Sequence, residues 1–306
     1  MRHIVLIFLL LPMLLWAQYE RPGSTSAQFL KIGVSARAAG MSNAFISAVE
    51  GAEAAYYNPA ALVGIKRIGL AFTHTCWFAG INHEFAALGY NLGHNSVLAF
   101  SVTALYTDAM KVRTPLQPDG TGATFYAGSN RFGLSFARYL TNHVSFGSTV
   151  NFINIYLDKG FSKNGITVDV AVLYRTNYHG FRFGMMISNF GSSIKFVNES
   201  YPPPTTFTFG LNFNPVELKT QRVMFSIAAE KPNDGKPIGK SGVEYTVKNH
   251  LFLRAGYRLN SEVETFSFGF GFKLNIHNWP AQFDYAYSDF SELGATHRFG
   301  LNLNWE

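Results

Sequence analysis

The sequence is poor in cysteine and in charged residues. Its one cysteine, Cys76, excludes an internal disulfide, and the adjacent Trp77 and Phe78 indicate a buried or lipid-facing thiol. Charged residues make up only 14% of the chain, fewer than the 16% that are aromatic, which is low for a soluble surface. The net charge of +6 is not gathered into basic runs, so the composition argues against a nucleic-acid partner.

Sequence motifs of catalysis, metal binding and cofactor binding are also missing. The nine histidines are scattered and show no paired His-x-x-x-His spacing. There is no glycine-rich phosphate loop and no Gly-x-Ser-x-Gly motif. Ser192 and Lys195 fit a Ser-x-x-Lys string, but the companion motifs of a penicillin-type acylase are lacking. We therefore predict a protein that is not an enzyme and that uses no metal ion and no cofactor.

Only one long apolar run is present, and it lies at the N-terminus. Residues 4–16 form a run of thirteen residues interrupted only by Pro12, preceded by Arg2 and His3 and followed by Ala17. A membrane-spanning helix needs about 20 residues, whereas the apolar region of a signal peptide has roughly 7 to 15. We predict that residues 1–17 are a secretory signal peptide. No later stretch approaches 18 consecutive apolar residues, so a mature chain in a membrane would span it as a barrel.

The rest of the chain shows a strong alternation of apolar and polar residues. Near the C-terminus, Phe299, Leu301, Leu303 and Trp305 share one side of an extended chain. Successive side chains of a strand point to opposite faces, so such a segment has one apolar and one polar face. Most segments run for nine to fifteen residues, and a tilted strand needs roughly 9 to 11 to cross a bilayer.

This pattern predicts an all-β fold, a 14-stranded antiparallel transmembrane β-barrel at residues 66–306. The predicted strands are 66–75, 83–91, 95–107, 130–140, 143–157, 163–174, 180–190, 203–213, 221–230, 239–247, 250–259, 262–274, 279–288 and 295–305. Connections after even-numbered strands are mostly short, whereas 108–129, 191–202, 231–238 and 289–294, after odd-numbered strands, are longer. Short periplasmic turns opposite long external loops are typical of outer-membrane barrels, which places both chain ends in the periplasm.

The polar faces of the predicted strands carry most of the mid-strand charges. A Lys or Arg on the lipid face costs about 2 to 4 kcal/mol at the bilayer midplane, so these faces should line the lumen while the apolar faces meet outer-membrane lipids. Because these faces carry charges of both signs, we expect a network of ion pairs that holds the strands to a segment inside the barrel, a plug. The predicted lumenal charge network consists of Arg67, Asp169, Arg182, Arg222, Glu244, Arg254, Arg258, Asp284 and Arg298.

Residues 18–65 do not alternate and precede the predicted barrel. Residues 35–49 are rich in alanine and other small residues, which favours one or two short helices broken near Gly40. The asparagine of Asn58-Pro59 favours an extended or turn conformation and can bond its own backbone. A fourteen-stranded barrel has space inside, so we predict that residues 18–65 form a short helical and loop plug in the lumen. A flexible periplasmic tail is the alternative.

Residues 32–41, the pair Ala44-Phe45 and residues 56–62 together resemble the N-terminal signature of the PorV/PorQ family, and the length is nearer PorQ. The signature residues of the plug are Arg37, Gly40, Asn58, Pro59 and Ala60. That family is akin to the FadL transporters, fourteen-stranded outer-membrane barrels with an N-terminal hatch. The resemblance implies a location in the outer membrane of a Gram-negative, Bacteroidetes-like cell.

The resemblance leaves two main functions open. PorV and PorQ are accessory components of type IX protein secretion and surface attachment, so the first expectation is a docking barrel that binds secretion components or cargo proteins. FadL relatives admit fatty acids or other hydrophobic compounds through the barrel wall, so the alternative is a conduit for hydrophobic small molecules. For the conduit, the residues expected to line the lumen with apolar surface are Leu173, Met186, Met224 and Tyr257. An open porin is a third possibility, and it would require the plug to leave a water path clear.

Overall fold

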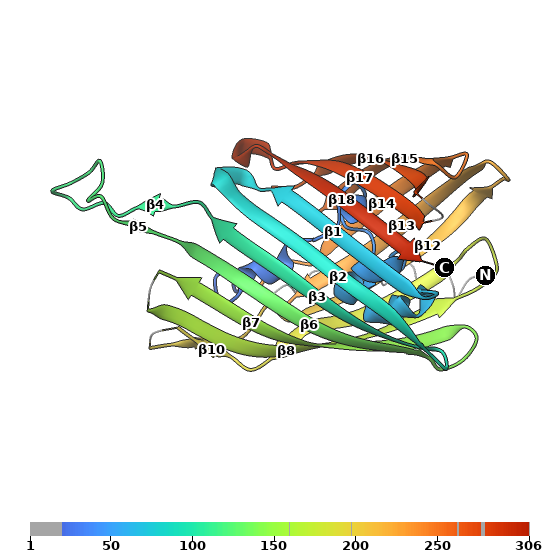
Figure 1. Cartoon of the computed structure of the whole chain (residues 1–306), viewed down its shortest axis with the longest axis horizontal. Helices are drawn as coiled ribbons and strands as arrows, with labels where there is room; N and C mark the ends of the chain where they lie inside the picture. Colours follow the sequence, from blue (N-terminus) through green and yellow to red (C-terminus); the bar gives the residue numbers. More distant parts are fainter. Residues whose placement is uncertain (1–19, 159, 197, 262, 277–278, 306) are drawn as a thin grey trace, which may run out of the picture.

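The structure is a computed structural model that describes residues 20–158, 160–196, 198–261, 263–276 and 279–305. The predicted signal peptide, residues 1–17, lies outside the described residues. Fourteen of the described strands pair antiparallel into a closed barrel, in the order β1-β18-β17-β16-β15-β14-β13-β12-β9-β8-β7-β6-β3-β2 (Figure 1). The predicted fold class is therefore confirmed.

The barrel strands lie close to the predicted ranges; for example, the strand predicted at 143–157 is found at Val144–Leu157. Their bounds are β1 Ile68–Cys76, β2 Ile81–Gly93, β3 Ser96–Thr107, β6 Ala127–Tyr139, β7 Val144–Leu157, β8 Phe161–Arg175, β9 Arg182–Gly191, β12 Thr206–Glu217, β13 Gln221–Pro232, β14 Ile238–Val247, β15 Leu251–Leu259, β16 Phe266–Ile276, β17 Trp279–Asp289 and β18 Ala295–Trp305. Two small hairpins, β4 Met110–Lys111 with β5 Thr124–Phe125 and β10 Ile194–Lys195 with β11 Ser200–Tyr201, lie in predicted long loops.

The apolar rows of the sequence form the outer surface of the barrel. Phe266, Phe268 and Phe270 of β16 are 53%, 57% and 47% exposed, and similar side chains surround the wall. Such a continuous apolar belt would be unfavourable in water, and covering one large apolar side chain is worth about 1.5–3 kcal/mol. The belt therefore fits contact with lipid acyl chains. Tyr257, expected in the lumen, instead faces outward because its strand parity is that of the apolar row. Its ring packs against that of Phe266 with the centroids 4.9 Å apart.

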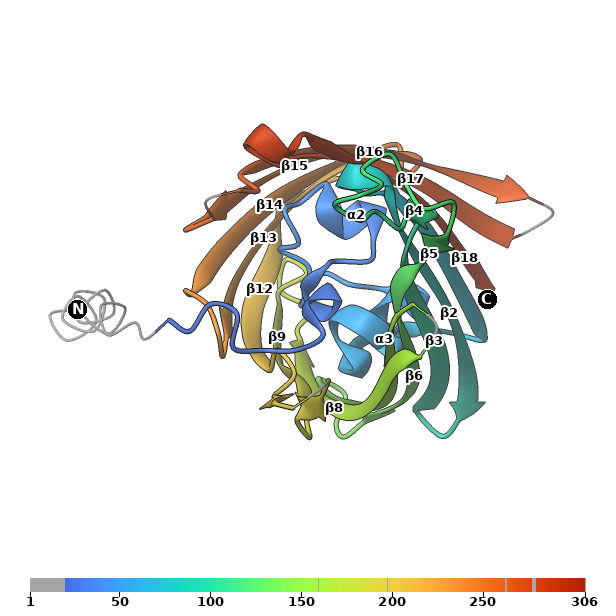
Figure 2. The same cartoon turned by 90° about the vertical axis from the view of Figure 1, so that its left-hand side faces the viewer.

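The segment before β1 fills the lumen as a plug (Figure 2). Its short helices are η2 Gln28–Lys31, α2 Ala36–Ala39, η3 Gly51–Glu53, α3 Ala54–Tyr57 and η4 Pro59–Gly64, and two more, η5 Phe78–Gly80 and η6 Ser291–Leu293, lie in barrel connections. None of the helices in the described ranges is long and apolar enough to cross a bilayer. Plug residues such as Met41, Phe45 and Leu62 are fully buried against the wall, so the main apolar core of the molecule lies inside the barrel.

The barrel has a long-loop end, with the β3–β6 and β9–β12 connections, and a short-turn end, with the β2–β3 and β14–β15 turns. β1 begins at the short-turn end, as predicted. The described chain, however, starts at the long-loop end: the amide of Arg21 donates to the carbonyl of Asp234 at 3.3 Å, and that of Ser26 to Pro202 at 2.9 Å. The expectation that both chain ends lie at the short-turn side is therefore wrong for the N-terminal part, because the plug runs the length of the lumen.

Candidate functional site

The signature residues of the plug place α2 directly on the barrel wall. Ser35 caps the helix, since its hydroxyl accepts a hydrogen bond from the amide of Ala38. Gly40 follows the helix, and a Cβ there would lie 3.0 Å from the Cα of Gly269 in β16. The two glycines thus allow close contact between plug and wall. The helix ends at Ala39, so the break predicted near Gly40 is confirmed.

Asn58, Pro59 and Ala60 form a buried turn at the other end of the plug. The side-chain oxygen of Asn58 accepts a hydrogen bond from the amide of Ala60 at 3.1 Å, and its amide group donates to the carbonyl of Ile46 at 2.8 Å. The predicted bond between Asn58 and its local backbone is confirmed. Pro59 starts η4, and the Pro59–Ala60 backbone lies so close to Gly147 of β7 that no side chain fits at Gly147.

An ion-pair network, which we call the plug clamp, joins the plug to the wall through Arg37, Glu244, Arg254 and Asp284. Arg37 donates from Nε and Nη2 to the two carboxylate oxygens of Glu244, both at 2.8 Å. Arg254 donates from Nε to Glu244 and from Nη1 to Asp284, both at 2.7 Å. Arg222 lies 3.8 Å from Glu244. All four clamp side chains are at least nine-tenths buried, so removal of any one would strand a buried charge.

A second network, on the opposite side of the lumen, links β6, β7, β8 and β9. Arg131 donates to Asp169 at 2.7 Å and to Asn151 at 2.9 Å, and its guanidinium lies 4.6 Å from the ring centroid of Tyr56 in the plug. The other oxygen of Asp169 accepts from the amide of Asn189 at 2.7 Å. Asp169 was among the predicted lumenal charges and Arg131 was not, although Arg131 alternates with the outward Phe132 and its strand parity therefore places it in the lumen.

The remaining predicted network residues are not all brought together. Arg182 pairs with the plug residue Glu50 at 2.7 Å, and Arg258 pairs with Glu264 at 2.6 Å. Arg67 is exposed at the short-turn end, where it lies 4.7 Å from the ring centroid of Trp305. Arg298 is buried, and it lies 5.5 Å from the ring centroid of Trp77. Neither Arg67 nor Arg298 is part of the plug clamp.

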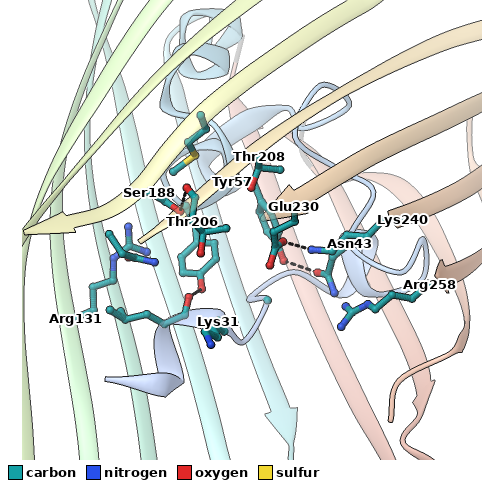
Figure 3. A pocket seen from close by; sticks show the side chains of 15 residues that line it. Lys31, Asn43, Tyr57, Arg131, Ser188, Thr206, Thr208, Glu230, Lys240 and Arg258 are labelled. Atoms are coloured by element: carbon teal, nitrogen blue, oxygen red, sulfur yellow. Dashed lines mark hydrogen bonds and ion pairs between the residues drawn. The ribbon is translucent and has the colours of Figure 1, made fainter. Parts of the chain in front are cut away.

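A cavity of about 110 Å³ lies between the plug and the wall on the long-loop side (Figure 3). Leu30, Tyr56, Tyr57 and Met186 give it apolar and aromatic surface. The charged residues that line it are Lys31, Arg131, Glu230, Lys240 and Arg258.

Each cation that lines the cavity has its own carboxylate partner. Lys31 lies 2.6 Å from Asp234, and Lys240 forms a close ion pair with Glu230. Arg131 and Arg258, on opposite sides of the cavity in Figure 3, pair with Asp169 and Glu264 respectively. Because the charges cancel in pairs, the cavity has no excess charge with which to attract an ionic ligand. Within the described ranges, no group of three His, Cys, Asp or Glu side chains is arranged to hold a metal ion.

The ladder between β9 and β12 ends beside this cavity. Their pairing extends from Arg182 and Asn212 to Ser188 and Thr206 and stops there. Asn189 follows with a left-handed backbone (φ 58°), at a bulge where the β8–β9 register shifts.

Side-chain hydrogen bonds replace the ladder beyond this point. The hydroxyl of Thr205 donates to the carbonyl of Asn189 at 3.1 Å, and the side chain of Asn189 donates to the carbonyl of Pro204 at 3.5 Å. The residues before Thr205 are Pro202, Pro203 and Pro204, which have no N–H group with which to continue the ladder. We call this place the β9–β12 gap.

Glu53 is a carboxyl group buried between the plug and the wall. It is 2% exposed and accepts a hydrogen bond from Asn302 at 3.2 Å. Burial raises the pKa of Glu53 to about 7, and the negative charge of Asp284 contributes in the same direction. Ser35, Asn302 and Arg37 lower the pKa but do not offset burial. The plug therefore contains a group that titrates near neutral pH.

Replacing Glu53 by glutamine is expected to make stability less dependent on pH. The folded protein holds the Glu53 proton more tightly than the unfolded chain, for which the ordinary pKa is 4.5. The stability that this bound proton contributes is fully present below the unfolded pKa of 4.5 and is lost as the pH rises through about 7. Glu53→Gln should therefore unfold at a higher temperature than the wild type at about pH 8 and at a similar one at about pH 4. Thermal unfolding in detergent micelles tests this, and parallel pH profiles of the two proteins would contradict it.

Comparison with solved structures finds the same barrel fold in FadL-like proteins. It matches the CymD monoaromatic hydrocarbon channel with a TM-score of 0.58 and 14% identity over 89% of this chain and 96% of that one. It matches the Pseudomonas putida toluene transporter TodX with a TM-score of 0.58 and 11% identity over 89% and 96%. A Pseudomonas aeruginosa FadL homologue gives a TM-score of 0.52 and 9% identity over 89% and 98%. No family model and no curated protein sequence matches.

Because these identities are low, the matches establish the fold alone. The chain has the plugged fourteen-stranded barrel fold of FadL-like outer-membrane channels, and the FadL-like part of the sequence resemblance is confirmed. The apolar belt of this barrel fits the environment of an outer membrane. The more specific PorV/PorQ resemblance gains no support from these three structures.

Proposed function

We propose that this protein is a non-enzymatic outer-membrane channel for small hydrophobic compounds, the alternative that the sequence left open. The observation that carries the proposal is the position of the cavity. It lies between the plug and the wall on the long-loop side, and it borders the β9–β12 gap through Ser188, Asn189 and Thr206. The cavity is therefore in contact both with the plug and with the place where the ladder between β9 and β12 ends.

The cavity chemistry favours a neutral compound. Its cations are all paired with carboxylates, and its tyrosine rings and Met186 offer apolar contact. Its volume of about 110 Å³ is similar to that of a cavity of about 150 Å³ that holds benzene in another protein. The structures of a monoaromatic hydrocarbon channel and of a toluene transporter share this fold. We infer that a compound with a single aromatic ring is a suitable substrate.

The outer surface supports passage through the gap into the bilayer. Phe190, Ile187 and Phe207 flank the gap on the lipid side, and they are 66%, 46% and 38% exposed. An apolar compound that left the cavity between β9 and β12 would therefore enter an apolar environment. The other expected role, in type IX secretion with secretion components or cargo as partners, is not supported by the matched structures.

A disulfide across the wall beside the gap is expected to block uptake. Ser188 and Thr206 are directly paired, so their Cα atoms are about 4.5–5.5 Å apart, within the range that a disulfide spans. The variant Ser188→Cys/Thr206→Cys, with Cys76→Ser, should lose most uptake of labelled toluene by whole cells when oxidised, and a reductant should restore it.

The matched control is Ser135→Cys/Thr149→Cys in the same background, because these residues are paired in an unbroken part of the wall. Oxidation of the control should leave uptake unchanged. Equal uptake by the oxidised and reduced forms of the test variant, with the disulfide shown to be formed, would reject passage through the gap. Absence of uptake above that of cells without the protein would reject the proposed function itself.

A further inference from the structure

A second recess, of about 330 Å³, lies at the short-turn end, on the side of the plug away from the cavity described above. Its plug side includes Glu50 and Ile65, and its wall side includes Arg175 and Arg182 from β8 and β9. Lys273 and Trp305, from β16 and β18, complete the wall. The recess therefore lies at the short-turn mouth of the barrel, between the plug and strands from both sides of the wall.

Among the described residues that line the recess, positive charges outnumber negative ones even without Lys66, which has a partner of its own. Arg175, Arg182 and Lys273 are the other cations, and Glu50 is the one carboxylate among these described residues. Arg175 donates to two neutral groups, the hydroxyl of Tyr139 at 3.0 Å and the carbonyl of Ala61 at 3.3 Å. Within the described part of the chain, neither Arg175 nor Lys273 has a carboxylate within ion-pair distance. The recess thus lacks the balance of charges found in the cavity on the long-loop side.

Glu50 shows that the recess already accommodates a carboxylate. One of its oxygens accepts a hydrogen bond from Nη2 of Arg182 at 2.7 Å, and the side chain remains 52% exposed. A guanidinium group presents several N–H donors in a plane, which suits the oxygens of carboxylates and phosphates. Ile65, Ile68 and Trp305 add apolar surface beside the cations, where an organic group can lie.

We propose that this recess binds the oxyanion of a small organic molecule, a carboxylate or a phosphate, at the short-turn mouth of the barrel. Arg175 and Lys273 supply the charge that is not matched by the protein, and Arg182 supplies donors that it shares with Glu50. The apolar side chains hold the organic part of the ligand. The site is independent of the proposed uptake of neutral compounds, because the plug separates the recess from the cavity on the long-loop side.

Calorimetric titration of the full mature chain in detergent micelles tests the proposal with three probes. Benzoate represents an organic carboxylate, inorganic phosphate represents a free phosphate, and benzyl alcohol is a neutral analogue of benzoate. We expect benzoate or phosphate to bind, and benzyl alcohol not to displace it. Binding should weaken as salt is added, because the attraction is electrostatic. Binding of benzoate alone would identify a carboxylate site, and binding of phosphate alone would identify a phosphate site.

The variants Lys273→Gln and Arg175→Lys/Lys273→Gln should lower the affinity for the bound anion, the double variant by about tenfold or more. Lys111→Gln removes the same charge from an exposed hairpin far from the recess, and it should bind like the wild type. The migration of unheated protein on a denaturing gel verifies that each barrel is folded. The proposal is overturned if neither anion binds, or if Lys273→Gln and Lys111→Gln bind the anion equally well. Toluene uptake is unaffected by either result, so the two proposals can fail separately.

Discussion

Replacing Glu244 by glutamine is expected to lower the free energy of unfolding by about 3–5 kcal/mol. Glu244 is fully buried and accepts hydrogen bonds from both Arg37 and Arg254 at 2.7–2.8 Å. Glutamine keeps the size of the side chain but removes its charge. Arg254 is then left with Asp284 as its carboxylate partner, and Arg37 with Glu50, which is 3.8 Å away. The cost is large because a charge in a low-dielectric interior cannot be compensated by water.

Urea unfolding in detergent micelles, followed by tryptophan fluorescence, measures this difference. Glu217→Gln is the matched control, because Glu217 is an exposed carboxylate at the end of β12 and its loss should change stability by less than about 0.5 kcal/mol. Similar midpoints for the two variants would show that the plug clamp does not hold the plug to the wall.

Replacing Gly147 by leucine is expected to displace the plug and open the lumen. The backbone of Pro59 and Ala60 lies directly against Gly147, where even a Cβ atom has no space. Because η4 is anchored there, a larger side chain must push the turn at Asn58 away from the wall, at a cost of about 1–3 kcal/mol. We expect the wild type to conduct ions poorly in planar bilayers and Gly147→Leu to conduct them several-fold better.

Val150→Leu is the control for this experiment. Val150 lies on the same strand as Gly147 but is 52% exposed on the lipid side, so a larger apolar side chain there should leave conductance unchanged. Equal conductance of Gly147→Leu and the wild type, with both barrels folded, would mean that the plug does not close the lumen at this contact.

The barrel was predictable from the sequence because each wall residue has only two possible directions. Strand parity places Phe268 outside and Asp284 inside, and the lipid outside makes an error in that choice expensive. Tyr257 obeys the same rule, because it is two residues from the outward Ala255 and Leu259; the expectation that it lines the lumen was inconsistent with its strand parity. The fourteen strands and the positions of the long loops therefore followed from periodicity.

The partners within the lumen were not predictable in this way. Arg37 and Glu244 are 207 positions apart, and they meet only because the closed wall brings β14 to the face that α2 occupies. The path of the plug has no periodic signal, so the sequence did not show that the chain starts at the long-loop end. The gap beside Asn189 depends on a bulge between β8 and β9, which alternation does not reveal.

The route of the plug constrains how the molecule can be assembled. The chain runs from the contact between Ser26 and Pro202 at one rim, through the whole lumen, to the start of β1 at the other rim. The ring is closed by the pairing of β1 with β18, the first and last strands of the wall. A finished ring would have to be threaded by a segment that fills it almost completely. Enclosure of the plug must therefore precede or accompany the joining of this seam, so that the tertiary contacts of the interior serve as a template around which the hairpins curl.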